Sequence, residues 1–194
     1  MRKEKFDFLR EKVKAENIPT VRDKTLQKLR GEVFAAQPKK ILEIGTAAGI
    51  SGAAMLLCAD EAKLVTIEKD PDFADRARGI FRALGLEKRV TLLEGDADEI
   101  VPLLSGGYDF IFLDGPKGKY AAYLPDLKAL LKPGGVLFAD NISLKFYGLK
   151  HSEHRNRTAH VNMAHFLETM RTDEDFSVRF FEEEDGALIA EKLR

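Results

Sequence analysis

Short apolar runs alternate along this chain with longer segments in which apolar positions recur every three or four residues. Five runs predict strands, at 41–44, 64–67, 90–93, 110–113 and 136–139. The intervening helical spacing predicts helices at 51–59, 70–84, 98–104 and 120–131, the second one opening on Asp70-Pro71. Because the strand runs are continuous rather than alternating, they are typical of a parallel sheet that is covered on both faces.

The two ends of the chain depart from this alternation. Helical spacing predicts two opening helices, around 6–13 and 26–33, and one late helix around 163–170. A break at 17–19 separates the opening pair. The last two apolar runs, 176–181 and 187–190, flank an acidic turn that ends in glycine, so we expect a hairpin.

These elements predict an α/β fold with a Rossmann-like, doubly wound sheet of seven strands. The sheet is mainly parallel with a C-terminal antiparallel hairpin, and helices cover both faces. Pro133-Gly-Gly135 is expected to form a turn before the fifth strand. With 194 residues, the chain suits one domain, with N-terminal helices at 1–36 and a core at 37–194.

Composition indicates the cellular compartment in which we expect the protein. Cys58 is the only cysteine, so no disulfide can form within the chain, which fits a reducing compartment. The start of the chain lacks the apolar stretch of a secretory signal, and no apolar run approaches the roughly 20 residues that span a bilayer. We therefore expect a cytoplasmic protein that does not contact membranes.

The first predicted strand runs into a glycine turn, Glu43-Ile-Gly45-Thr-Ala-Ala-Gly49-Ile-Ser51. Glycine lets the backbone approach a ligand closely, and the next helix directs N–H groups at an anion. Glu68 ends the second strand, where a carboxylate can accept ribose hydroxyls, and Asp96 follows the third, where it can accept from adenine or cap a helix. Together these strand ends indicate an adenosine-bearing cofactor. The glycine spacing differs from Gly-x-Gly-x-x-Gly, so a nicotinamide enzyme is the poorer alternative.

A second group of polar residues follows the fourth and fifth strands. Asp114 comes directly after the fourth strand, and Asp140-Asn141 after the fifth. Two carboxylates and an amide oxygen are hard ligands that suit Mg²⁺, Mn²⁺ or Ca²⁺ better than Zn²⁺. An acidic residue after the fourth strand is also common in proteins of this fold class that use no metal, so Asp140-Asn141 is the more specific part of this prediction.

These stretches resemble the catechol-type O-methyltransferases, in particular the bacterial branch that includes caffeoyl-CoA and tRNA 5-hydroxyuridine methyltransferases. The resemblance extends over 18–192 and is carried by 40–51, 66–68, 95–97, 110–117 and 139–141. It implies transfer of a methyl group from S-adenosylmethionine to a hydroxyl oxygen, with a divalent cation. Two features depart from the family: Gly115-Pro116 stands where bacterial members have Ala-Ala, and the N-terminal region, which helps many relatives form a homodimer, is shorter.

The resemblance also implies residue roles. Lys117 would act as the catalytic base beside Asp114, and Asp114, Asp140 and Asn141 would hold the metal. The expected cofactor-binding residues are Glu43, Gly45, Thr46, Gly49, Ser51, Glu68, Asp96, Ala97 and Asp114. A non-catalytic module that only binds S-adenosylmethionine is the alternative of another class, and the intact catalytic set disfavours it.

The methyl acceptor is predicted from the distribution of charge. Residues 1–30 contain ten Lys or Arg and five Asp or Glu, and 143–160 contain four Lys or Arg and one Glu. Two basic segments favour an RNA acceptor, a 5-hydroxyuridine in tRNA, whose phosphates Lys145, Arg155 and Arg157 would contact. The alternatives are a small catechol-like diol as acceptor and two ordinary solvated helix faces.

Overall fold

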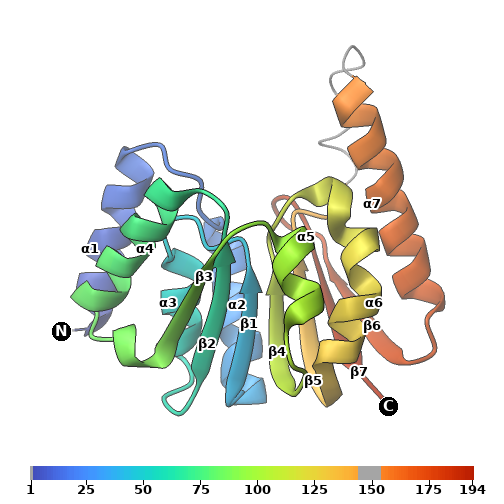
Figure 1. Cartoon of the computed structure of the whole chain (residues 1–194), viewed down its shortest axis with the longest axis horizontal. Helices are drawn as coiled ribbons and strands as arrows, with labels where there is room; N and C mark the ends of the chain where they lie inside the picture. Colours follow the sequence, from blue (N-terminus) through green and yellow to red (C-terminus); the bar gives the residue numbers. More distant parts are fainter. Residues whose placement is uncertain (1, 144–153) are drawn as a thin grey trace.

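The computed structural model describes residues 2–143 and 154–194, with side chains in the last long helix described from residue 158 on (Figure 1). One seven-stranded sheet forms its centre, in the order β3-β2-β1-β4-β5-β7-β6. The strands that pair in parallel are β1 (Lys40–Ile44), β2 (Lys63–Glu68), β3 (Val90–Glu94), β4 (Tyr108–Leu113) and β5 (Leu131–Asp140). The antiparallel hairpin is β6 (Phe176–Phe181) and β7 (Ala187–Lys192). The predicted doubly wound sheet with its closing hairpin is confirmed.

Helices cover both faces of the sheet. One face is packed by α1 (Arg2–Ala15), α2 (Asp23–Ala36), α3 (Ile50–Leu56) and α4 (Pro71–Ala83). The other is packed by α5 (Ala97–Ile100), α6 (Tyr120–Leu130) and α7 (His154–Thr172), and three 3₁₀ turns, η1 (Glu87–Arg89), η2 (Val101–Leu103) and η3 (Lys117–Lys119), complete the elements (Figure 1). None of the helices in 2–143 and 154–194 is long and apolar enough to cross a membrane.

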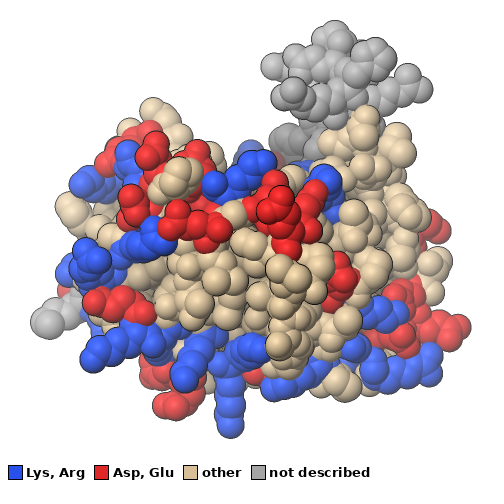
Figure 2. All heavy atoms as spheres, viewed as in Figure 1, with Lys and Arg blue, Asp and Glu red and all other residues tan. Residues whose placement is uncertain are grey.

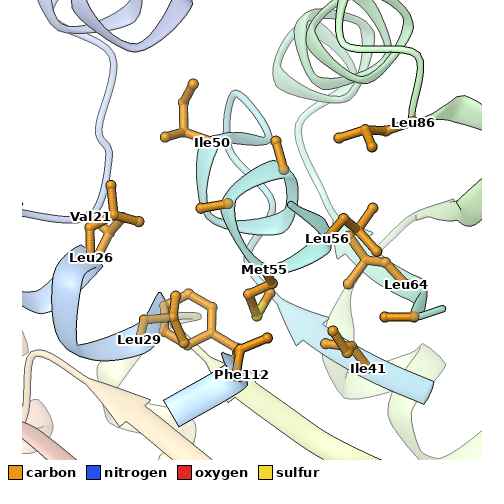
Figure 3. Packing of buried hydrophobic residues seen from close by; sticks show 14 of the residues in the cluster. Val21, Leu26, Leu29, Ile41, Ile50, Met55, Leu56, Leu64, Leu86 and Phe112 are labelled. Carbon is orange, nitrogen blue, oxygen red and sulfur yellow. The ribbon is translucent and has the colours of Figure 1, made fainter. Parts of the chain in front are cut away.

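Most strand positions are apolar because the strands contribute side chains to two cores. Ile41, Phe110 and Phe112 face the first cluster, whereas Leu42 and Ile111 face the second. In the first cluster, α3 lies close to the sheet, with its side chains packed among those of α2, β1 and β4 (Figure 3). Burying one large apolar side chain stabilises the fold by about 1.5–3 kcal/mol, so the helices on both faces of the sheet contribute to the free energy of unfolding.

The fifth strand begins earlier than the sequence predicts. Pro133-Gly-Gly135, expected as a turn, lies inside β5, and α6 ends at Leu130. Tyr108 pairs with Leu131 and Phe110 pairs with Val136, so β5 advances five residues where β4 advances two. The chain bulges out of the ladder and returns to it, and Gly134 permits this with a φ of 76°.

The N-terminus of α2 is held by the distant hairpin turn. Arg22, the residue before the helix, makes no capping hydrogen bond with its side chain. Instead, the Glu184 carboxylate accepts from Lys24 N at 3.1 Å, from Thr25 N at 2.8 Å and from Thr25 Oγ1 at 2.9 Å. Burial raises the pKa of Glu184, but these hydrogen bonds outweigh it, so the pKa lies below the usual glutamate value.

We predict that Glu184→Ala lowers the free energy of unfolding by about 1–2 kcal/mol at neutral pH, because three donors at the start of α2 lose their acceptor. Since the folded-state pKa is depressed, this contribution is lost as the pH falls below the ordinary glutamate value, and the difference from wild type should shrink in acid. Urea denaturation at several pH values measures it. Glu183→Ala, which removes an exposed ion pair with Lys24 from the same turn, is the control. Equal losses in the two variants would contradict the capping role.

Candidate active site

A cavity of about 400 Å³ lies at the carboxyl ends of the parallel strands. Many of the residues that the sequence predicts to form the site line this cavity, namely Gly45, Thr46, Ser51, Glu68, Asp114, Lys117, Asp140 and Asn141. The rest of its wall comes from the segment before α2, the hairpin turn, the starts of α3 and α4, and neighbouring residues of the turns after β1 and β4. Such an edge is where ligands bind in open α/β sheets.

The glycine turn after β1 lies directly against the end of β4. Gly45 has a φ of 97°, and a Cβ placed there would lie 2.6 Å from the backbone oxygen of Asp114. Gly45 N and Thr46 N both donate to Ile67 O, at 3.1 and 3.2 Å. The turn is therefore bonded to β2 on one side and packed on β4 on the other, which only glycine allows at this position.

Glu43 lies beneath the glycine turn and does not line the cavity. It accepts from Ser51 Oγ at 2.5 Å and from Thr66 Oγ1 at 2.6 Å. Because the Thr66 hydroxyl hydrogen is used there, Thr46 Oγ1 must donate to Thr66 Oγ1 across the 2.5 Å that separate them. Burial raises the pKa of Glu43 to about 7, against the opposing effect of these hydrogen bonds. In this arrangement Glu43 fixes the turn from below.

Glu68 faces the cavity from the end of β2. One carboxylate oxygen accepts from Ala47 N at 2.7 Å, and the other accepts from Lys69 N and Asp70 N, both at 2.9 Å. Three N–H groups thus hold the carboxylate in one orientation, with lone pairs left for a ligand that donates.

The remaining expected cofactor residues lie outside the cavity wall. Asp96 caps α5 by accepting from Asp98 N at 3.0 Å and pairs with Lys69 Nζ at 3.0 Å. Ala97 opens that helix and is buried. Gly49 has a φ of 81°, and a Cβ placed there would lie 3.0 Å from the Ala77 Cβ of α4. The capping role considered for Asp96 is therefore present in the fold.

Asp114 and Asp140 approach each other at the ends of β4 and β5. Asp140 is only 2% exposed, and burial, followed by the nearby Asp114 charge, raises its pKa well above the usual aspartate value. Asn141 N donates to Asp140 Oδ1 at 2.7 Å, and Asn141 itself has a φ of 56°. Asparagine tolerates this left-handed backbone better than most residues, which suits it to this position.

The donor chemistry of this edge suits a hard divalent cation. In the described part of the chain, no three His, Cys, Asp or Glu side chains form a metal-binding group. The set consists of two carboxylates and the Asn141 amide, and all its ligand atoms are oxygens. Two crowded carboxylates, one of them buried, are an environment that a cation stabilises. These residues could therefore hold Mg²⁺ or Mn²⁺.

Lys117 and Tyr120 connect the strand ends. Lys117 Nζ donates to Asp114 Oδ1 at 2.5 Å and to the Tyr120 hydroxyl at 2.9 Å. The buried Tyr120 hydroxyl lies 2.9 Å from Leu113 O and 3.0 Å from Asp140 O, so it joins the last residues of β4 and β5. Sequence reasoning missed Tyr120, although a tyrosine three residues after Lys117, at the start of a helix, was a usable signal.

Arg22 and Asp185 were also missed. Arg22 Nε pairs with Asp185 Oδ2 at 2.6 Å, and both residues line the cavity beside Asn141. The signal was topological. A strand that runs antiparallel to β5 begins where β5 ends, and the register pairs Asp140 with Ala187. The acidic turn before β7 therefore had to lie next to Asp140 and Asn141.

The three residues expected to contact RNA, Lys145, Arg155 and Arg157, lie outside the described side chains. In the N-terminal segment, at least five of the ten basic residues already pair with carboxylates, namely Arg10, Lys14, Arg22, Lys24 and Lys28. On the face in Figure 2, acidic and basic side chains mingle along the upper edge, whereas Lys and Arg predominate along the lower edge. The described residues on that face therefore form no uniformly basic rim at the strand ends.

A family model matches almost the whole chain, and curated relatives match a little over half of it. A family model for O-methyltransferases matches residues 10–193. Catechol O-methyltransferase B of Danio rerio is 36% identical over 121 residues, which are 57% of this chain and 45% of the relative. Catechol O-methyltransferase of Niastella koreensis is 36% identical over 111 residues, or 55% and 50%. The chain thus spans about half the length of the curated relatives it matches.

Solved structures share the whole architecture. A Klebsiella pneumoniae protein assigned as an O-methyltransferase superposes with a TM-score of 0.86 at 26% identity, covering 98% of this chain and 90% of that one. The Bacillus cereus O-methyltransferase in complex with SAH gives a TM-score of 0.85 at 23% identity, covering 97% and 90%, and shows the fold alone. The match of the family model to nearly every residue decides the assignment, and the chain belongs to the O-methyltransferase family.

Proposed function

We propose that this protein transfers the methyl group of S-adenosylmethionine to a hydroxyl oxygen of a small catechol-like diol, with a divalent cation held by Asp114, Asp140 and Asn141. The observation that carries the proposal is that one cavity contains a glycine turn, a ribose-type carboxylate, a pair of carboxylates and a lysine. A module that only binds the cofactor would need neither the buried second carboxylate nor Lys117.

The cofactor would bind against β1 and β2. Glu68 has its carboxylate fixed by three N–H groups and would accept from the ribose hydroxyls. Ser51 and the glycine turn would contact the methionine end, and Glu43 would act indirectly, by holding Ser51 in place. Asp96, half-buried and two residues after β3, would contact the adenine amine.

The methyl group is already activated by its sulfonium, so the protein must supply an oxygen nucleophile in line with it. A cation bound by Asp114, Asp140 and Asn141 would lower the pKa of the acceptor hydroxyl and orient it. Lys117 would accept the hydroxyl proton. S-adenosylmethionine would supply the methyl group to this oxygen, and the electron pair of the broken carbon–sulfur bond would stay on sulfur. Asp114 and Tyr120 hold the lysine at the place where the proton is released.

Two considerations favour a small diol over RNA as acceptor. The relatives in zebrafish and Niastella are catechol O-methyltransferases by name. Many basic side chains of the N-terminal segment are compensated within the fold, so they offer phosphates less charge. Hydroxyuridine in tRNA stays the second candidate, because the basic segment after Asn141 lies outside the described residues.

We predict that Glu68→Ala weakens S-adenosylmethionine binding by about 10- to 100-fold, because charge-assisted hydrogen bonds to the ribose are worth about 1.5–3 kcal/mol. Isothermal titration measures the change. Glu94→Ala is the matched control, since Glu94 pairs in register with Glu68 but lies outside the cavity. An unchanged affinity in Glu68→Ala, with the protein still folded, would refute the assignment.

We also predict that the enzyme methylates catechol in a metal-dependent way. Methyl transfer from labelled S-adenosylmethionine to catechol should stop in EDTA and return with Mg²⁺ or Mn²⁺, because the acceptor hydroxyl loses its activating cation. Asp140→Ala should not recover on metal addition. The same assay with hydroxyuridine-containing tRNA identifies the acceptor. If label appears in tRNA and not in catechol, the acceptor is RNA. Full activity in EDTA would show that the reaction needs no divalent cation.

A further inference from the structure

Asp185 connects three parts of the cavity wall. Its backbone oxygen accepts from Ser143 N at 2.8 Å, two residues beyond Asn141. Its Oδ2 lies 3.3 Å from Asn141 Nδ2 and 2.6 Å from Arg22 Nε. The side chain is 14% exposed, and its Oδ1 is buried without a hydrogen-bond partner among the described residues. Among the residues proposed to bind the cation, Asn141 is the one whose side chain Asp185 contacts directly.

The chemistry of the two groups fixes the orientation of the Asn141 amide. An ionised carboxylate only accepts hydrogen bonds, so the amide atom that faces Asp185 must be the nitrogen. The amide oxygen, the only atom of that group that binds a cation, is then directed away from Asp185. Without this contact the amide can turn over, because its terminal torsion is broad and close to two-fold.

We propose that Asp185 is a positioning residue that directs the Asn141 amide oxygen to the cation set, and that Arg22 holds Asp185 in place. The inference rests on the proposed function, in which Asn141 is a ligand. Arg22 also supplies a positive charge, which offsets the third carboxylate at an edge that already carries Asp114 and Asp140.

Direct ligation by Asp185 is the weaker interpretation. Asp114, Asp140 and Asp185 do not form a metal-binding group in the described part of the chain. The Asp185 Oδ2 atom already has two donors, from Asn141 and Arg22, which leaves the buried Oδ1 as the one oxygen of this group that could reach a cation. Asp185 therefore acts through Asn141, and a neutral acceptor of the same shape should replace it.

The test is the affinity for Mn²⁺, measured by electron paramagnetic resonance in the absence of substrate. Asp185→Ala should weaken Mn²⁺ binding about 10-fold or more, as loss of a residue that orients a ligand does. Asp185→Asn should restore most of the affinity, since its amide oxygen still accepts from Asn141. Arg22→Ala should show a smaller loss. Glu183→Ala is the matched control in the same turn, because Glu183 pairs with Lys24, and it should leave Mn²⁺ binding unchanged.

The outcomes separate the two proposals. If the wild-type protein fails to bind Mn²⁺, the proposed cation site is wrong. If the wild type binds Mn²⁺ and Asp185→Ala, checked for folding by circular dichroism, binds it equally well, the positioning role is wrong. If Asp185→Asn is as weak as Asp185→Ala, the carboxylate is itself a ligand, and the inference is overturned. Should Asp185→Ala not fold, Arg22→Ala decides, since equal Mn²⁺ affinity in that variant contradicts the proposal. S-adenosylmethionine affinity in Glu183→Ala should equal that of the wild type, since Glu183 lies outside the cavity.

Discussion

The close approach of carboxylates at one buried edge is the constraint on which this site depends. Parallel pairing sets it: Ile44 pairs with Leu113, and Leu113 pairs with Ala139, so the next residues on β4 and β5, Asp114 and Asp140, must be neighbours. Burial and the nearby Asp114 charge both disfavour the charged form of Asp140. A sheet with this register therefore requires compensating donors at its edge, or a cation, for Asp140 to stay ionised.

The compensation comes largely from neutral donors placed by the backbone. Glu43 is satisfied by two hydroxyl groups, and Glu68 by three backbone N–H groups. Asp140 accepts from the N–H of Asn141, which adopts a left-handed conformation at that point. Among the described carboxylates that line the cavity, Asp114 and Asp185 are the two that pair with cationic side chains. Short-range donors fix orientation without adding mobile charge, so each carboxylate is held in one geometry before any ligand arrives.

Features of the site that depend on residues close together in the sequence could be predicted, whereas those that depend on distant residues could not. Strand ends are local features, so apolar runs were enough to bring Gly45, Glu68, Asp114 and Asp140 to one edge. Glu43 was expected to touch the cofactor, but the side-chain alternation of β1 directs it beneath the turn, where hydroxyl groups satisfy it. The Gly-Gly turn became a bulge because β4 and β5 keep pairing beyond it. Asp185 reaches the cavity only through hairpin register, which composition does not reveal.

The wall that completes the cavity joins the two ends of the described chain. The Glu184 carboxylate binds the first turn of α2, and Asp185 binds Arg22 just before it. Through Asn141 and Ser143, the same turn is bonded to the segment after β5. Asp140 is buried because this wall lies over an edge that a bare parallel sheet would leave open to water. Since burial is the largest cause of its raised pKa, the electrostatics of the carboxylate pair depend on contacts about 160 residues apart in the sequence. Packing of α2 against the hairpin is therefore part of what keeps Asp140 buried beside Asp114.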